Sequence, residues 1–66
     1  MLKPKITIAE IRAKHGKMSQ EEFGASVGVS AQTVGAWEKD ILKISPIYLL
    51  RITEKYGISS SDLLGA

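Results

Sequence analysis

Residues 18–38 read MSQEEFGASVGVSAQTVGAWE, and their spacing predicts two short helices separated by a tight turn. Ser19 is a favourable N-cap, and Glu22 stands three residues later, where a glutamate side chain completes a capping box. Phe23 and Val27 lie four residues apart and give this helix an apolar stripe for the core. Gly28 follows at a position where helices commonly end.

A second helix is predicted over residues 31–39, with Ser30 as its N-cap. Val34 and Trp37 are three residues apart, so they share one face of this helix and are expected in the core. Gly35 lies in the helix interior, where it costs about 1 kcal/mol relative to alanine. That cost indicates a packing or close-approach reason for the glycine.

The connection between these two helices is very short and centres on Gly28, Val29 and Ser30. A link of this length makes the helices cross steeply, and Gly28 can adopt the left-handed backbone that such a turn favours. Val29 is placed to fill the angle between the helices. The segment is therefore a candidate helix-turn-helix, a unit whose second helix can enter the major groove of duplex DNA.

Two more helices are predicted directly before and after this unit. The preceding helix covers about residues 7–15, with Thr7 and Glu10 as a candidate capping box and Gly16 as its stop. A connecting loop is expected over residues 40–44. Ser45 as a cap and Pro46 then mark the start of the fourth helix, because proline is favoured at the first helical position.

The fourth helix is expected to bury an apolar stripe at helical spacing and to stop at Gly57. The stripe consists of Leu49, Ile52, Thr53 and Tyr56. A short fifth helix follows, with Ser59 and Asp62 as a further candidate capping box before Leu63 and Leu64. Since no segment alternates like a strand, the sequence predicts an all-α fold of five helices.

Length and composition fit one small domain, expected over residues 1–66 with a core from about residue 7 to residue 64. The absence of cysteine excludes a disulfide framework, and a single histidine excludes a histidine-rich metal site. The chain also lacks clustered carboxylates and a glycine-rich phosphate loop. We therefore expect no enzyme, with no catalytic residues, no metal and no cofactor.

The apolar residues do not form a membrane segment, because no run approaches the roughly 18 residues that span a bilayer. The basic residues of the N-terminus are not followed by the apolar stretch of a secretory signal. We therefore expect a soluble, cytoplasmic protein with no membrane partner and no small-molecule substrate.

The formal net charge of +2 hides an uneven distribution along the chain. Residues 1–17 carry five Lys or Arg against one Glu, whereas residues 18–38 carry three Glu and no basic residue. Lys39 and Lys43 then restore a positive excess. Basic stretches on both sides of a neutral-to-acidic segment are compatible with a polyanionic partner without requiring one.

These motifs together resemble the lambda-repressor-like helix-turn-helix domains of XRE type, whose pattern is L-S-Q-E-E-L-A, then L-G-V-S, then T-I-S-x-W-E. Residues 49–64 are similar to the family's closing pattern of L-L-K-I-A, L-G-V-S and D-E-L-L. The resemblance extends from about Ile8 to Leu64. It implies a five-helix lambda-repressor-like bundle, with the helix-turn-helix formed by the second and third helices, that binds DNA.

The resemblance also implies roles for individual residues. Gln20 matches a glutamine that grips a DNA phosphate at a helix N-terminus, where free backbone N–H groups attract anions. Arg12 and Glu38 match a pair that ties the first helix to the third. The positions expected to contact bases are Ala31, Gln32, Thr33 and Ala36. The positions expected to contact phosphates are Gln20, Lys17, Gly35, Lys39 and Lys43.

This chain departs from the family pattern in its loops and on its third helix. It has one extra residue near Lys17 and a longer, more apolar loop around Ile41 and Leu42. Two base-contacting positions are alanine, so Gln32 is the only amide there that can bind adenine through two hydrogen bonds. Because alanine can meet thymine methyl groups, we expect an A·T-leaning site, partly selected by DNA shape.

Two functions from different classes follow. The first is a sequence-specific duplex-DNA binder that regulates transcription and is of phage or prophage repressor type. Such a protein is expected to be bacterial or phage-encoded, cytoplasmic and associated with the nucleoid. It is expected to bind an operator of two half-sites about 34 Å apart as a weak homodimer. Candidate dimer contacts are Ile47, Leu50, Ile58 and Leu64. The alternative is a protein-interaction module of antitoxin or co-regulator type, which the apolar Ile41 and Leu42 loop favours.

Overall fold

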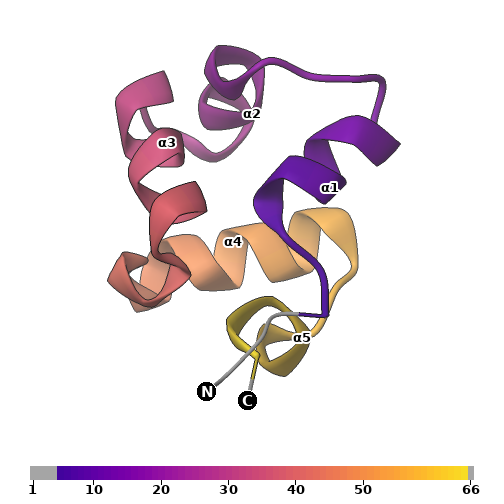
Figure 1. Cartoon of the computed structure of the whole chain (residues 1–66), viewed down its shortest axis with the longest axis vertical. Coiled ribbons are helices and arrows are strands. Elements are labelled where there is room, and N and C mark those ends of the chain that lie inside the picture. The colour runs from indigo at the N-terminus through magenta and orange to yellow at the C-terminus, as the bar shows by residue number, and fades with distance from the viewer. Residues whose placement is uncertain (1–4, 66) are drawn as a thin grey trace.

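The computed structural model describes residues 5–65, in which five α-helices and one 3-10 turn follow each other along the chain (Figure 1). They are α1 (Ile8–Lys14), α2 (Gln20–Val27), α3 (Ala31–Lys39), the single 3-10 turn η1 (Ile41–Lys43), α4 (Pro46–Tyr56) and α5 (Ser60–Leu64). No strand occurs among the described residues, so the predicted all-α class with five α-helices is confirmed. Lys3, part of the predicted basic stretch, lies outside the described residues.

The first three helices begin where the sequence predicted. Thr7 and Ser19 each form a complete capping box, in which the hydroxyl accepts a bond from a backbone N–H three residues later and the glutamate there bonds back. Ser30 caps α3 by accepting from the backbone N–H of Thr33 at 3.3 Å. The side chains at these helix starts therefore satisfy backbone groups that would otherwise need water.

The last two α-helices begin at the predicted residues, but their capping bonds differ from the prediction. Ser45 makes no side-chain capping bond, and α4 starts on Pro46, whose missing N–H costs nothing in a first turn. Ser59 accepts from the backbone N–H of Asp62 at 3.1 Å without completing a capping box. Aspartate is one methylene shorter than the glutamate that closes the boxes of α1 and α2.

The predicted loop over residues 40–44 contains a turn of 3-10 helix instead of irregular chain. The Asp40 carboxylate accepts from the backbone N–H of Leu42 at 3.2 Å and starts this turn. The backbone N–H of Ile44 then donates to the carbonyl of Ile41 at 3.0 Å. A single turn has no periodic pattern to detect in a sequence, but it directs Ile44 into the core.

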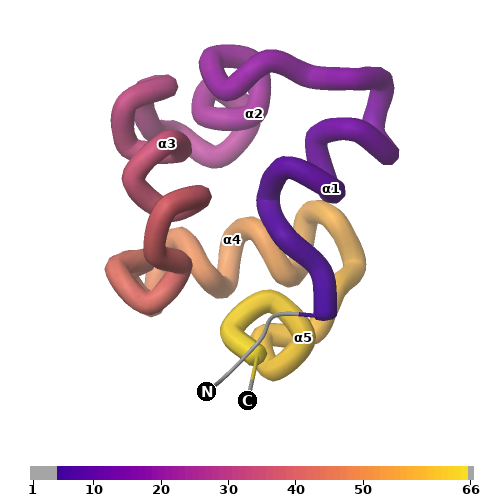
Figure 2. The backbone as a smooth tube through the Cα atoms, viewed as in Figure 1, coloured from indigo at the N-terminus to yellow at the C-terminus, as the bar shows by residue number. Residues whose placement is uncertain are grey.

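The connection between α2 and α3 is the tight turn that the sequence predicted (Figure 2). Gly28 adopts left-handed backbone, with φ 92° and ψ 29°. The backbone N–H groups of Gly28 and Val29 both donate to the carbonyl of Gly24 at 2.8 Å. Val29 is partly buried and packs against the core, so the turn is closed by backbone bonds and anchored by an apolar side chain.

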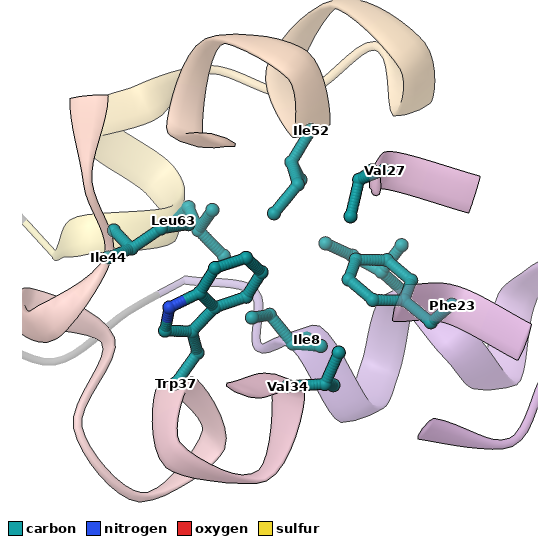
Figure 3. Close-up of a cluster of buried hydrophobic side chains, with 9 residues drawn as sticks. Ile8, Phe23, Val27, Val34, Trp37, Ile44, Ile52 and Leu63 are labelled. Carbon is teal, nitrogen blue, oxygen red and sulfur yellow. The ribbon is translucent and has the colours of Figure 1, made fainter. Parts of the chain in front are cut away.

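The core collects side chains from all five α-helices and from the residue after η1 (Figure 3). Phe23, Val34 and Trp37 are among the buried residues, as predicted. The complete buried set is Ile8, Ile11, Phe23, Val27, Val34, Trp37, Ile44, Ile52 and Leu63. Because every α-helix contributes to one cluster, the orientation of α3 depends on packing throughout the chain.

The predicted stripe of α4 is only partly in the core. Ile52 is fully buried, whereas Leu49, Thr53 and Tyr56 keep part of their surface exposed. The Tyr56 ring stacks on Phe23, and its hydroxyl lies 2.7 Å from the Ser26 hydroxyl, so the polar end of the tyrosine has a hydrogen-bond partner.

None of the helices within residues 5–65 has the length and hydropathy to span a lipid bilayer.

Candidate nucleic-acid interface

Helix α3 has one buried face and one open face. Val34 and Trp37 are buried and hold the helix against the core. Gln32, Ala36 and Lys39 are exposed and follow each other at intervals of four and three residues, so they line the opposite face. The open face of α3 therefore presents one amide, one methyl group and one ammonium group to solvent.

A shallow hollow in the surface joins this face to the start of α2 and to η1. Six of the nine predicted DNA-contacting residues line it, together with Glu38. We call it the α2–α3 hollow; its lining residues are Gln20, Gln32, Gly35, Ala36, Glu38, Lys39 and Lys43. Residues separated by up to 23 positions in the sequence thus share one concave surface.

The other three predicted contact residues do not line this hollow. Ala31 is the first residue of α3 and is partly buried. Thr33 is also partly buried, and its hydroxyl lies 3.2 Å from the Ser30 hydroxyl at the helix start. Lys17 is exposed in the turn between α1 and α2, where it has a positive φ of 55°.

Gln20, the first residue of α2, is partly buried, and its amide is hydrogen-bonded. Its Nε2 donates to Oε1 of Glu38 at 3.1 Å, a contact between the start of α2 and the last turn of α3. Because an amide nitrogen carries two hydrogens, this bond leaves Nε2 with a second donor. The side chain that the sequence assigns to a phosphate is therefore held in place within the protein.

Glu38 also binds Arg12, the pair that the family resemblance implied. Arg12 Nε donates to Oε2 of Glu38 at 2.9 Å, and Arg12 Nη2 donates to Oε1 at 3.2 Å. The two side chains are 21% and 19% exposed, and Arg12 Nη1 donates in addition to the carbonyl of Met18 at 3.0 Å. A bidentate, largely buried ion pair of this kind fixes α1 against α3 more firmly than a single exposed contact.

Gly35 lies under the amide of Gln20. A Cβ atom on Gly35 would come within 3.6 Å of Gln20 Nε2 and 3.7 Å of Oε1, which is ordinary van der Waals contact. Its backbone has no positive φ. Neither backbone conformation nor intramolecular packing therefore requires a glycine at this position.

Comparison with known proteins identifies the family. A family model described as helix-turn-helix matches residues 8–63. The chain belongs to this helix-turn-helix family. The match confirms the resemblance to lambda-repressor-like domains and the assignment of the unit to α2 and α3.

One curated protein of Bacillus subtilis (strain 168) is a relative. It is the uncharacterized HTH-type transcriptional regulator YgzD, which is 38% identical over 56 residues, or 85% of this chain and 83% of the relative. No solved structure matches the chain significantly.

Several residues that shape this helix-turn-helix were not predicted from the sequence. Gly24 is buried in α2, and a Cβ there would lie 2.5 Å from the backbone oxygen of Val29, so α2 approaches the turn too closely for a side chain. Arg51 of α4 donates to the carbonyl of Val27 at 3.1 Å and lies over the Tyr48 ring. A glycine inside a helical pattern could have predicted the close approach at Gly24. The bond of Arg51 depends on tertiary packing, which no local pattern predicts.

The charges of the α2–α3 hollow favour an anion at its edges. Lys39 and Lys43 both line it and are exposed. The free backbone N–H groups and positive dipole end of α2 lie at Gln20. Glu38 is the only acidic residue of the lining set, and Arg12 compensates its charge.

Proposed function

We propose that this chain binds duplex DNA sequence-specifically through its helix-turn-helix and regulates transcription as a phage- or prophage-type repressor. The observation that carries the proposal is the α2–α3 hollow, which combines the start of α2, the open face of α3 and two lysines in one surface. The lysines and the start of α2 suit contacts with DNA phosphates, and the open face of α3 suits contacts with the bases.

The proposed base contacts come from α3. Gln32 is exposed and suits adenine, which offers one acceptor and one donor at its major-groove edge. Ala36 is exposed beside it and suits a thymine methyl group. Ala31 and Thr33 complete the proposed set from the first turn of the helix. The expected operator is therefore A·T-leaning at the positions nearest to Gln32 and Ala36.

The proposed phosphate contacts surround these positions. Gln20 and Gly35 face the hollow from α2 and α3, while Lys39 and Lys43 supply positive charge from the end of α3 and from η1. Lys17 would contact the backbone from the turn before α2. Affinity should therefore depend strongly on salt concentration, because each neutralised phosphate releases bound counterions.

A weak homodimer on DNA is part of the proposal, because one helix covers too few base pairs for a selective operator. Ile47 and Leu50 are each 56% exposed, one turn apart on α4, and are the best candidates for the contact between two copies. Ile58 and Leu64 are partly buried and pack against the core, so less of their surface is free for a partner.

A protein-interaction module is the alternative function. Leu42 of η1 is 63% exposed, the largest value among the described large apolar side chains, and exposed apolar surface is typical of protein contacts.

A regulator that acts on DNA would work in the cytoplasm, and neither function involves an enzymatic activity or a cofactor.

Selection of bound sequences from a random duplex library, followed by affinity measurements, tests the proposal. We expect a palindromic, A·T-leaning operator, and we expect Gln32→Ala to weaken binding by about fivefold or more, since a bidentate base contact contributes about 1–3 kcal/mol. Lys55→Ala serves as a control, because Lys55 is exposed on α4 and does not line the hollow. Failure to enrich any duplex would contradict the proposal and favour a protein partner.

A further inference from the structure

We propose that Glu38 is a positioning residue for the DNA-backbone contact of Gln20, and that Arg12 acts by neutralising Glu38. This inference rests on the proposed DNA-binding function, and it assigns a joint role to three side chains from three different helices. Glu38 itself lines the α2–α3 hollow, yet as a carboxylate it would repel a phosphate there. Its presence in a DNA-facing surface therefore calls for a reason other than direct contact.

The first step is the orientation of the Gln20 amide. Nε2 donates to Oε1 of Glu38 at 3.1 Å, and the amide plane lies over Gly35, with Nε2, Oε1 and Cδ all within 4 Å of the position that a Cβ would occupy. A glutamine side chain in water samples many rotamers, and binding in one of them costs conformational entropy. Glu38 removes that cost in advance and leaves the second Nε2 hydrogen available to a phosphate oxygen.

The second step is the compensation of charge. Glu38 accepts two bonds from Arg12, at 2.9 and 3.2 Å, and its Oε1 is shared between the Arg12 guanidinium and the Gln20 amide. Both charged side chains are largely removed from water, with exposures of 21% and 19%. Without Arg12, a largely buried negative charge would remain beside the phosphate that Gln20 is proposed to bind.

A purely structural role for the three residues makes a different prediction. If the Arg12 and Glu38 pair only ties α1 to α3, its removal lowers stability and affects DNA binding equally with or without the Gln20 amide. If Glu38 positions Gln20, the effects of Glu38 and Gln20 substitutions on operator affinity are coupled. A double-mutant cycle separates these cases, because coupling appears only between residues that act together.

The test measures operator affinity by fluorescence anisotropy for Gln20→Ala, Glu38→Ala and the double variant, at a temperature where circular dichroism shows each to be folded. In the native background Gln20→Ala should weaken binding about tenfold, the effect of one hydrogen bond to a charged group. In the Glu38→Ala background the same substitution should cost less than about threefold. Equal costs in both backgrounds would overturn the inference.

Glu38→Gln supplies the rescue control, since its amide oxygen can still accept from Gln20. In that background the cost of Gln20→Ala should return to about tenfold. Arg12→Met should weaken binding more than Lys14→Met, a substitution that removes an exposed positive charge from the same helix. Adding Glu38→Gln to Arg12→Met should recover part of that loss, and no recovery would contradict the neutralising role of Arg12.

A measurement without DNA distinguishes this inference from the proposed function. The side-chain amide signals of Gln20 in an NMR spectrum should differ from those of a free glutamine in the native protein and in Glu38→Gln. They should approach the free values in Glu38→Ala. Unperturbed signals in the native protein would refute the positioning role. Perturbed signals with no DNA affinity would refute the proposed function instead.

Discussion

Gly35 is the residue where the requirements of folding and of function can be separated most clearly. It lies in the middle of α3, where glycine is unfavourable, and the structure has room for a methyl group beside the Gln20 amide. A glycine that folding does not require is a candidate for close approach to a ligand. The proposed ligand at this position is the DNA backbone.

The substitution Gly35→Ala should therefore raise the free energy of unfolding by about 0.5–1 kcal/mol, because alanine loses less backbone entropy in a helix. Urea denaturation followed by circular dichroism measures the change. The same variant should bind the operator more weakly than the native protein despite its higher stability. Unchanged affinity would remove Gly35 from the proposed interface, and a loss of stability would contradict the packing around it.

At the scale of elements, local sequence rules predicted most helix starts and ends. The bounds of α3 were predicted correctly because a capping serine, an apolar pair and a change to loop residues all agree. The turn η1 was missed because one 3-10 turn has too few residues for a periodic pattern. Helix α4 begins on Pro46 as predicted, but the capping bond expected from the Ser45 side chain does not form.

The caps give a matched test at this scale. Ser19→Ala removes the hydroxyl that accepts from the backbone N–H of Glu22 at 3.0 Å and should lower the free energy of unfolding by about 1 kcal/mol. Ser45→Ala is the control, since Ser45 makes no side-chain capping bond and its replacement should change stability by less than about 0.5 kcal/mol. Thermal denaturation of both variants measures the difference, and equal effects would contradict the assigned caps.

At the scale of the whole molecule, a small core shared by every α-helix fixes the angle at which α3 is presented. The nine predicted contact residues came from a family resemblance, and the structure brings six of them into one hollow. The bond between Gln20 and Glu38 joins residues 18 positions apart. It depends on how α2 crosses α3, which no local pattern specifies, so the sequence did not predict it.

The substitution of Trp37 tests how much stability this small core loses when a large buried side chain is removed. The side chain is 4% exposed, and its ring lies 5.7 Å from that of Tyr48. Trp37→Ala should lower the free energy of unfolding by about 3–5 kcal/mol, a large share of the roughly 5–15 kcal/mol typical of a domain. Urea denaturation checks this value. A loss below about 1 kcal/mol would show that Trp37 is not a core residue in solution.

Salt dependence tests the distribution of charge across the molecule. Lys39 lines the α2–α3 hollow, whereas Lys55 is exposed on α4 away from it. Lys39→Ala should reduce the slope of log affinity against log salt by about 0.9, the value for one lost phosphate contact. Lys55→Ala changes the net charge equally and should leave the slope unchanged. Equal changes in slope for the two variants would show that DNA affinity depends only on the total charge of the protein.

An NMR titration with the duplex selected from the random library tests the central claim most directly. Backbone amide signals are followed as the operator is added to the native protein. We predict that the largest changes fall at the start of α2 and on the open face of α3, at Gln20, Gln32 and Ala36. Changes confined to Leu42, Ile47 and Leu50, or no changes at all, would contradict the account.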